Sequence, residues 1–113
     1  MSEWMKRLEQ YGVDLKTTMG RFLNDEGLYQ RCFDMFLRDE SLGNLGDALE
    51  KKDYEVAFAA AHTLKGVVGN MGFQPLYDAV CEIVEPLRSG VTENLDSKYR
   101  KITEEFEKIR ALR

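Results

Sequence analysis

The amino-acid sequence predicts an all-α protein, an antiparallel helical bundle with a four-helix core and short helices at its N-terminal end. Apolar residues recur at steps of three and four along most of the 113-residue chain, which is the periodicity of amphipathic helices. The sequence contains only two prolines and no strand-like alternation of useful length. Because long helices joined by short turns favour antiparallel neighbours, we expect residues 1–113 to form one helical domain.

Short helices are expected in the first half of the chain. One spans about residues 2–11, and a second lies around residues 15–22 before the polar run at 24–27 interrupts it. A third helix presents a wide apolar stripe over residues 29–37. The hydroxyl of Ser41 is suited to cap the N-terminus of a fourth helix.

Longer helices follow in the second half of the chain. Asp53 is suited to cap a helix that runs to about Met71, where Gly72 ends it. Pro75 favours the first turn of the next helix, which ends at the turn of residues 89–90. The last helix carries a heptad-like apolar stripe formed by Leu95, Tyr99, Ile102, Phe106 and Ile109.

The composition limits the classes of function. The formal net charge is −4, whereas nucleic-acid-binding proteins carry basic surfaces. No apolar run approaches the roughly 18 residues of a membrane span, and residues 1–10 lack the apolar block of a signal peptide. Cys32 and Cys81 lie far apart in no metal-ligand spacing, so we expect both to be reduced and partly buried. The chain is therefore expected to be a cytoplasmic monomer that binds neither nucleic acid nor membranes.

One helix carries the only histidine of the chain. On a helical wheel centred on Leu64, the core stripe of this helix is formed by Ala57, Ala60, Ala61, Val67, Val68 and Met71. His62 lies about 160° from Leu64 on that wheel, so its imidazole is predicted to point into solvent.

Small side chains surround the histidine on the same face. The wheel places Ala59, Gly66 and Gly69 beside His62, with Phe58 as a partly exposed ring towards one edge. A mid-helix glycine costs about 1 kcal/mol relative to alanine, and a glycine that faces solvent gains nothing from close packing. We therefore interpret both glycines as making space for the backbone of another protein near the imidazole.

A nearby lysine suggests the chemistry of this face. Lys65 lies one turn from His62, so its ammonium group can reach an anion held on the imidazole. A neutral imidazole, which predominates above about pH 6.5, can attack phosphorus without a separate base. The transfer then needs mainly in-line positioning and charge neutralisation. These features predict a phosphocarrier that passes a phosphoryl group to or from an aspartate of a partner protein.

Other cofactors are not expected on this chain. Residues 66–69 lack the lysine and the strand context of a P-loop, so no ATP-using kinase activity is predicted. The chain offers no obvious acidic cluster for a metal. We therefore predict no metal and no cofactor on the chain itself, and we expect the partner to supply Mg²⁺ together with the acceptor aspartate.

At these residues the sequence resembles the histidine-containing phosphotransfer (HPt) family of multistep phosphorelays. The family pattern is His-x-x-Lys-Gly with a further glycine six residues on, and it is matched by His62, Lys65, Gly66 and Gly72. Flanking matches extend the resemblance over residues 13–90.

The resemblance implies a helical bundle that exposes a phosphorylated imidazole on a central helix. It also implies a receiver domain of a response regulator as partner, docking on apolar surface around the histidine, with a hybrid histidine kinase as a further partner. Carried over by position, His62 accepts the phosphoryl group, Lys65 steadies it and Gly66 leaves room for the receiver.

Two alternative functions are also compatible with the sequence. Residues 71–73 look more like the phosphotransfer domain of chemotaxis-type kinases, because Phe73 stands where relay domains often have a small residue. A kinase fragment would continue into further domains, and the initial Met1 favours a separate protein. A helical adaptor that binds a receiver without chemistry is the second alternative. Such an adaptor would be expected to lose His62 or Lys65 first, and both residues are present.

Overall fold

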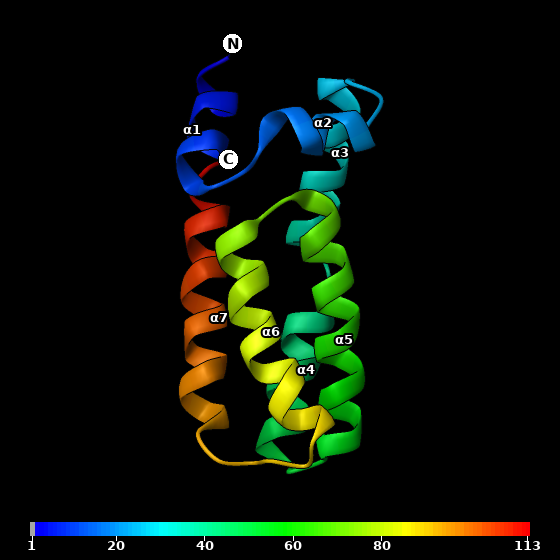
Figure 1. The fold of residues 1–113 in the computed structure, drawn as a ribbon, viewed down its shortest axis with the longest axis vertical. Helices are drawn as coiled ribbons and strands as arrows, with labels where there is room; N and C mark the ends of the chain where they lie inside the picture. Colours follow the sequence, from blue (N-terminus) through cyan, green and yellow to red (C-terminus); the bar gives the residue numbers. More distant parts are fainter. Residues whose placement is uncertain (1) are drawn as a thin grey trace.

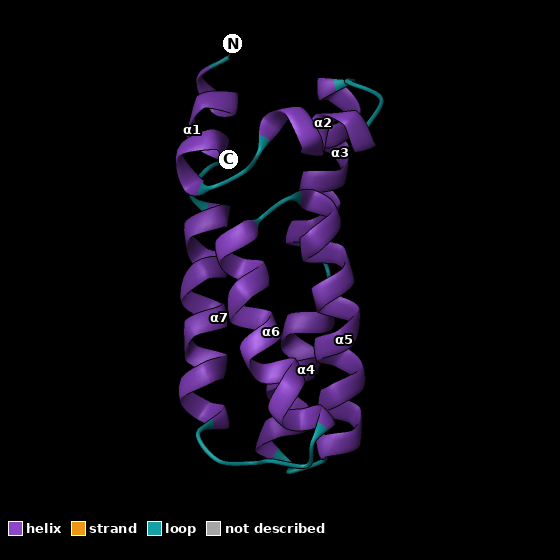
Figure 2. Cartoon of the chain, viewed as in Figure 1, coloured by secondary structure: helices purple, strands orange, loops and turns teal. Residues whose placement is uncertain are grey.

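The protein is a bundle of helices. The computed structural model describes residues 2–113, and this range contains seven α-helices and no strand (Figures 1 and 2). The helices are α1 (Glu3–Tyr11), α2 (Leu15–Arg21), α3 (Glu26–Leu37), α4 (Ser41–Glu50), α5 (Tyr54–Met71), α6 (Gln74–Arg88) and α7 (Leu95–Arg110). The predicted all-α bundle is confirmed, while Met1, the first residue of the predicted domain, lies outside the described residues. None of the helices within residues 2–113 combines the length and the hydropathy that a membrane crossing requires.

The central helix α5 begins and ends where the sequence predicts. At its N-terminus the Asp53 carboxylate accepts the backbone N–H of Val56 over 3.2 Å. At its C-terminus Gly72 adopts a left-handed backbone with φ +80°, which costs glycine little and lets its N–H bond back to the last turn. Pro75 lies in the first turn of α6, so the α5–α6 connection is short and the two helices run antiparallel.

Two details of the helix starts differ from the prediction. Ser41 is the first residue of α4 rather than its cap, and its backbone N–H donates to the Asp39 carboxylate over 2.8 Å. Residues 26–27 belong to α3 rather than to the preceding loop. The reason is that the Asp25 carboxylate accepts the N–H of Leu28 and starts the helix there. In both places an aspartate carboxylate, and not the residue expected from the pattern, satisfies the free N–H groups.

Helices α4 to α7 pack around a shared apolar core. Helix α4 contacts both α5 and α7, and α6 lies between α5 and α7 (Figure 1). The buried side of α5 is formed by Ala57, Ala61, Leu64, Val68 and Met71. Ala60 and Val67, which the wheel also placed on the core stripe, are half-buried at its edges. Cys32 and Cys81 are free and partly buried, as expected.

The N-terminal helices are gathered at one end of this bundle, where α2 lies across it and α3 runs from that end towards α4 (Figure 1). The molecule is 44 Å long, whereas the 18 residues of α5 span only about 27 Å, so α1 to α3 account for the remaining length. The Trp4 ring packs on Phe33 with centroids 5.2 Å apart. The Tyr11 hydroxyl donates to Glu105 over 3.0 Å, and burial raises the pKa of Tyr11, which keeps this donor protonated. Helix α1 is thereby tied to α3 and α7.

An aromatic cluster joins the N-terminal helices to the α5–α6 turn. Phe73 is fully buried, and its ring lies 5.6 Å from that of Phe33 and 5.2 Å from that of Phe36, centroid to centroid. The Tyr11 ring meets Phe73 edge-on at 6.3 Å. The large side chain of Phe73 therefore fills the core between α1, α3 and α6.

Candidate functional site

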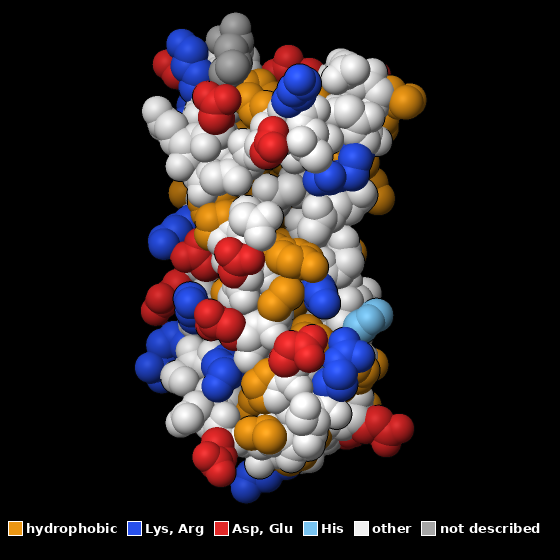
Figure 3. Space-filling view, viewed as in Figure 1, with side chains coloured by type: hydrophobic (Ala, Val, Ile, Leu, Met, Phe, Trp, Pro, Cys, Tyr) orange, Lys and Arg blue, Asp and Glu red, His pale blue; other side chains and the backbone are white. Residues whose placement is uncertain are grey.

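The single histidine lies on the solvent side of α5. His62 is exposed, whereas its neighbours Ala61 and Leu64 are buried, so the orientation predicted by the helical wheel is confirmed. In the space-filling view the histidine projects at the edge of the molecule, next to Lys and Arg side chains (Figure 3). The imidazole is accessible to another protein.

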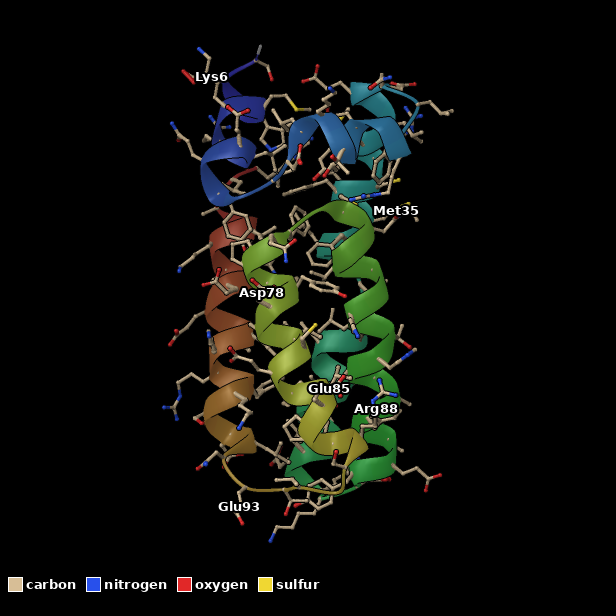
Figure 4. All side chains as sticks on the ribbon, in the orientation of Figure 1. Lys6, Met35, Asp78, Glu85, Arg88 and Glu93 are labelled. Atoms are coloured by element: carbon tan, nitrogen blue, oxygen red, sulfur yellow. The ribbon has the colours of Figure 1, made fainter. Side chains whose placement is uncertain are left out.

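An aromatic ring and an arginine support the imidazole on one side. The rings of Phe58 and His62 are 5.8 Å apart, centroid to centroid, at an interplanar angle of 39°. The guanidinium carbon of Arg88, at the last residue of α6, lies 5.3 Å from the centre of the Phe58 ring (Figure 4 labels Arg88). Phe58 is half-buried, as expected. Phe58 therefore restricts the imidazole on the side that faces the N-terminus of α5, and Arg88 packs on the Phe58 ring.

On its other side, towards the C-terminus of α5, His62 borders an open hollow of about 470 Å³. The hollow is lined by Arg21, His62, Lys65, Gly66, Gly69, Asn70 and Tyr77. These residues come from α2, α5 and α6, and they include two permanent cations but no carboxylate. The hollow thus has the charge that suits an anionic group.

Lys65 is held beside the hollow and keeps its ammonium group available. It is half-buried, and its Nζ lies 6.0 Å from the centre of the Tyr77 ring. Within residues 2–113 it forms no salt bridge. Because no carboxylate neutralises it, Lys65 can attract a phosphoryl group on the neighbouring imidazole.

The two glycines of this face have different surroundings. A Cβ atom added to Gly66 would meet nothing within 4 Å, so this position opens onto free space as predicted. A Cβ atom on Gly69 would lie 3.1 Å from Cε1 of Tyr77. Gly69 lines the hollow together with His62, as predicted, but it is half-buried rather than open to solvent, because the Tyr77 ring from α6 packs against it. The absence of a side chain at Gly69 lets the Tyr77 ring of α6 pack closely, whereas the absence of one at Gly66 leaves open space next to the histidine.

This difference predicts unequal effects on stability for two matched substitutions. Gly66→Ala is expected to stabilise the fold by up to about 1 kcal/mol, since alanine favours the helix and meets no neighbour. Gly69→Ala gains less or loses stability, because the Tyr77 ring must move by a few tenths of an ångström. Thermal melting of the two variants tests this. Equal rises in Tm would show that Tyr77 yields freely, and a fall for Gly66→Ala would show that its face is packed.

Ala59 lies outside the hollow. It is exposed, but it lines a separate depression between α4 and α5 together with Thr63. The structure therefore does not bring Ala59 together with His62, Lys65 and Gly66. Its predicted docking role rests only on its exposure near the histidine.

The sequence reasoning missed three residues of the site, namely Arg21, Tyr77 and Arg88. The sequence contains a signal for two of them, Tyr77 and Arg88. In an antiparallel hairpin, residues equally distant from the turn lie opposite each other. Phe58 and Arg88 are equally far from Phe73, and so are Gly69 and Tyr77. Arg21 had no comparable signal, because it reaches α5 from a separate helix.

The site can perform nucleophilic chemistry on an anionic group. An exposed imidazole offers a nitrogen lone pair, Lys65 supplies positive charge beside it, and Arg21 adds positive charge at the other edge of the hollow. Among residues 2–113 no group of three His, Cys, Asp or Glu side chains is arranged to hold a metal ion.

Comparison with known proteins identifies the family. The family model of the Hpt domain matches residues 33–112, which include α4 to α7 and His62. No curated protein and no solved structure is significantly similar to the chain. Since the match spans well over half of the chain, this protein belongs to the Hpt domain family, whose members act in histidine phosphotransfer in phosphorelays.

Proposed function

We propose that His62 carries a phosphoryl group and exchanges it with an aspartate on the receiver domain of a response regulator. The observation that supports this most directly is the exposed imidazole of His62 beside the unpaired Lys65 in a hollow without carboxylates. The membership in the Hpt family supports the same reaction. The chain then acts as a phosphocarrier between other proteins and does not itself use ATP.

Phosphoryl transfer from the aspartate to His62 requires no separate proton-transfer step. The lone pair of an imidazole nitrogen attacks the phosphorus of the aspartyl phosphate and forms an N–P bond. The P–O bond to the aspartate breaks, and the carboxylate leaves with its electron pair. The ring keeps the N–H proton on its other nitrogen, so its positive charge offsets part of the phosphoryl charge. Mg²⁺, placed on the receiver in this proposal, supplies further charge neutralisation there.

The neighbouring residues have distinct roles in this proposal. Lys65 neutralises the phosphoryl group on the imidazole, and Phe58 limits the orientations of the ring. The open space at Gly66 lets the receiver approach the histidine closely. In-line attack requires the imidazole nitrogen to come within about 3–3.5 Å of the phosphorus of the aspartyl phosphate, which a larger side chain at this position would hinder.

A transfer experiment tests the proposal directly. The protein is incubated with each phosphorylated receiver domain of the same organism, and the label is followed over time. We expect at least one receiver to lose its label while this chain gains an acid-labile, alkali-stable label, as a phosphohistidine does. The absence of transfer from every receiver, with receivers shown to be phosphorylated, would contradict the proposed function.

Lys65→Ala is expected to slow transfer about tenfold or more, because a charge-assisted interaction with the phosphoryl group is lost. The free energy of unfolding should change by less than about 0.5 kcal/mol, since Lys65 has no salt bridge within the described chain. Lys6→Ala on α1 is the control, because Lys6 lies at the N-terminal end of the molecule and does not line the hollow (Figure 4). Single-turnover rates of phosphoryl transfer from the receiver to this chain and back test the prediction. Unchanged rates in Lys65→Ala would show that Lys65 does not interact with the phosphoryl group during transfer.

A further inference from the structure

The arginine that reaches the hollow comes from outside the family match. Arg21 is the last residue of α2, and the Hpt match begins only at residue 33. Its Nε donates to the Asn70 carbonyl and its Nη2 to the Gly69 carbonyl, both over 3.2 Å. These carbonyls belong to the last turn of α5, where a cation is favoured by the helix dipole. The guanidinium is therefore fixed at the edge of the hollow that contains His62.

Part of this guanidinium is free to bind something else. An arginine has five N–H donors, and the two bonds to α5 leave three of them. Within residues 2–113 no carboxylate forms a salt bridge with Arg21. Asp14 lines a neighbouring depression with Arg21, but its carboxylate accepts the N–H and the hydroxyl of Thr17. Arg21 thus presents unused donors and an uncompensated charge at the surface.

The position of Arg21 indicates what it can bind. Gly69 lies seven residues after His62, which corresponds to about 10 Å along the axis of α5. Helical side chains point towards the N-terminus, so the imidazole is inclined away from Arg21. A phosphoryl group on His62 is therefore out of reach of Arg21. A protein that covers the histidine and the hollow would lie directly against it.

We propose that Arg21 is a docking residue that binds an acidic side chain on the surface of the receiver and thereby helps select the partner. This inference rests on the proposed function, since it assumes a receiver at His62. The hollow is continuous from His62 to Arg21, and its lining carries positive charge only. A guanidinium already oriented by two carbonyls loses little freedom when it pairs with a carboxylate. The N-terminal helices, which the family match leaves out, then contribute partner specificity.

A kinetic comparison tests this role. The rate of phosphoryl transfer to Arg21→Gln is measured against the concentration of the receiver that transfers fastest to the wild type. A parallel measurement uses phosphoramidate, a small donor that needs no docking surface. We expect KM for the receiver to rise about tenfold while kcat stays within about twofold. The ratio of receiver-driven to phosphoramidate-driven rates falls accordingly, and Arg21→Lys recovers part of the loss.

Controls separate docking from structure. Arg100→Gln on α7 removes an exposed arginine that does not line the hollow, and it should leave KM unchanged. If Arg21 only caps α5, Arg21→Gln will lower Tm but leave the ratio of the two rates at the wild-type value, which overturns the proposal. If the wild type accepts phosphate from phosphoramidate but from no receiver, the proposed function fails as well. If it accepts from a receiver and Arg21→Gln keeps the wild-type KM, only the role of Arg21 fails.

Discussion

Replacing His62 by glutamine is expected to abolish phosphoryl acceptance from any receiver while leaving the helical fold intact. A carboxamide has no nitrogen lone pair that is free to attack phosphorus, so the loss should be complete rather than partial. The side chain at this position is exposed and forms no hydrogen bond among the described residues, so its replacement should change the free energy of unfolding by less than about 0.5 kcal/mol. Acid-labile label on the protein and thermal melting measure the two quantities.

A neighbouring substitution provides the control for this experiment. Thr63 is exposed on the same turn of α5 but lines the depression towards α4. Thr63→Gln should therefore accept label as the wild type does, which shows that an added amide on this turn is harmless. Full acceptance of label by His62→Gln would mean that another residue carries the phosphoryl group, and the proposed function would have to be abandoned.

The second large effect is expected from Gly72→Ala, which should destabilise the fold by about 2–4 kcal/mol and lower Tm by roughly 10 °C. Two costs combine at this position. The backbone has φ +80°, where an L side chain is strained. The added Cβ would also meet the side chain of the buried Thr18, approaching Oγ1 closely and Cγ2 at 3.0 Å. Because Thr18 belongs to α2, this contact also sets where α2, and with it Arg21, lies against the end of α5.

Another glycine in the same chain separates the two costs. Gly90 has φ +75°, but a Cβ there would meet nothing within 4 Å. Gly90→Ala should therefore show only the backbone strain of about 1–2 kcal/mol. The difference between the two variants in chemical or thermal unfolding measures the clash with Thr18. Equal losses would show that α2 moves away from α5 without cost.

Local patterns in the sequence were sufficient for much of this architecture. The caps of α5 at Asp53 and Gly72 follow from backbone preferences that act within a few residues. The exposure of His62 follows from the helical period, because a single buried stripe centred on Leu64 leaves the opposite face to solvent. The family motif around His62 and Lys65 lies within one turn of this helix, so the centre of the candidate site was predicted together with the fold.

The periphery of the site was decided by the tertiary structure. A helical wheel assumes that only one face of a helix packs against the rest of the protein. Helix α5, however, is in contact with α2, α3, α4 and α6. Tyr77 therefore packs against Gly69 and leaves it half-buried, although the wheel had placed it in solvent, while Gly66 one turn earlier stays open. Ala59 faces α4 instead of the hollow for the same reason.

The helices, their buried stripes, the exposed histidine and Lys65 beside it could thus be predicted from the sequence, because they depend on periodicity and on caps within one segment. The other cations around the histidine, Arg21 and Arg88, are placed there by the packing of separate helices. Arg88 reaches Phe58 through the antiparallel pairing of α6 with α5, and Arg21 reaches the last turn of α5 because Thr18 packs against Gly72. Contacts of this kind join residues far apart in the chain, and no local period or propensity encodes them.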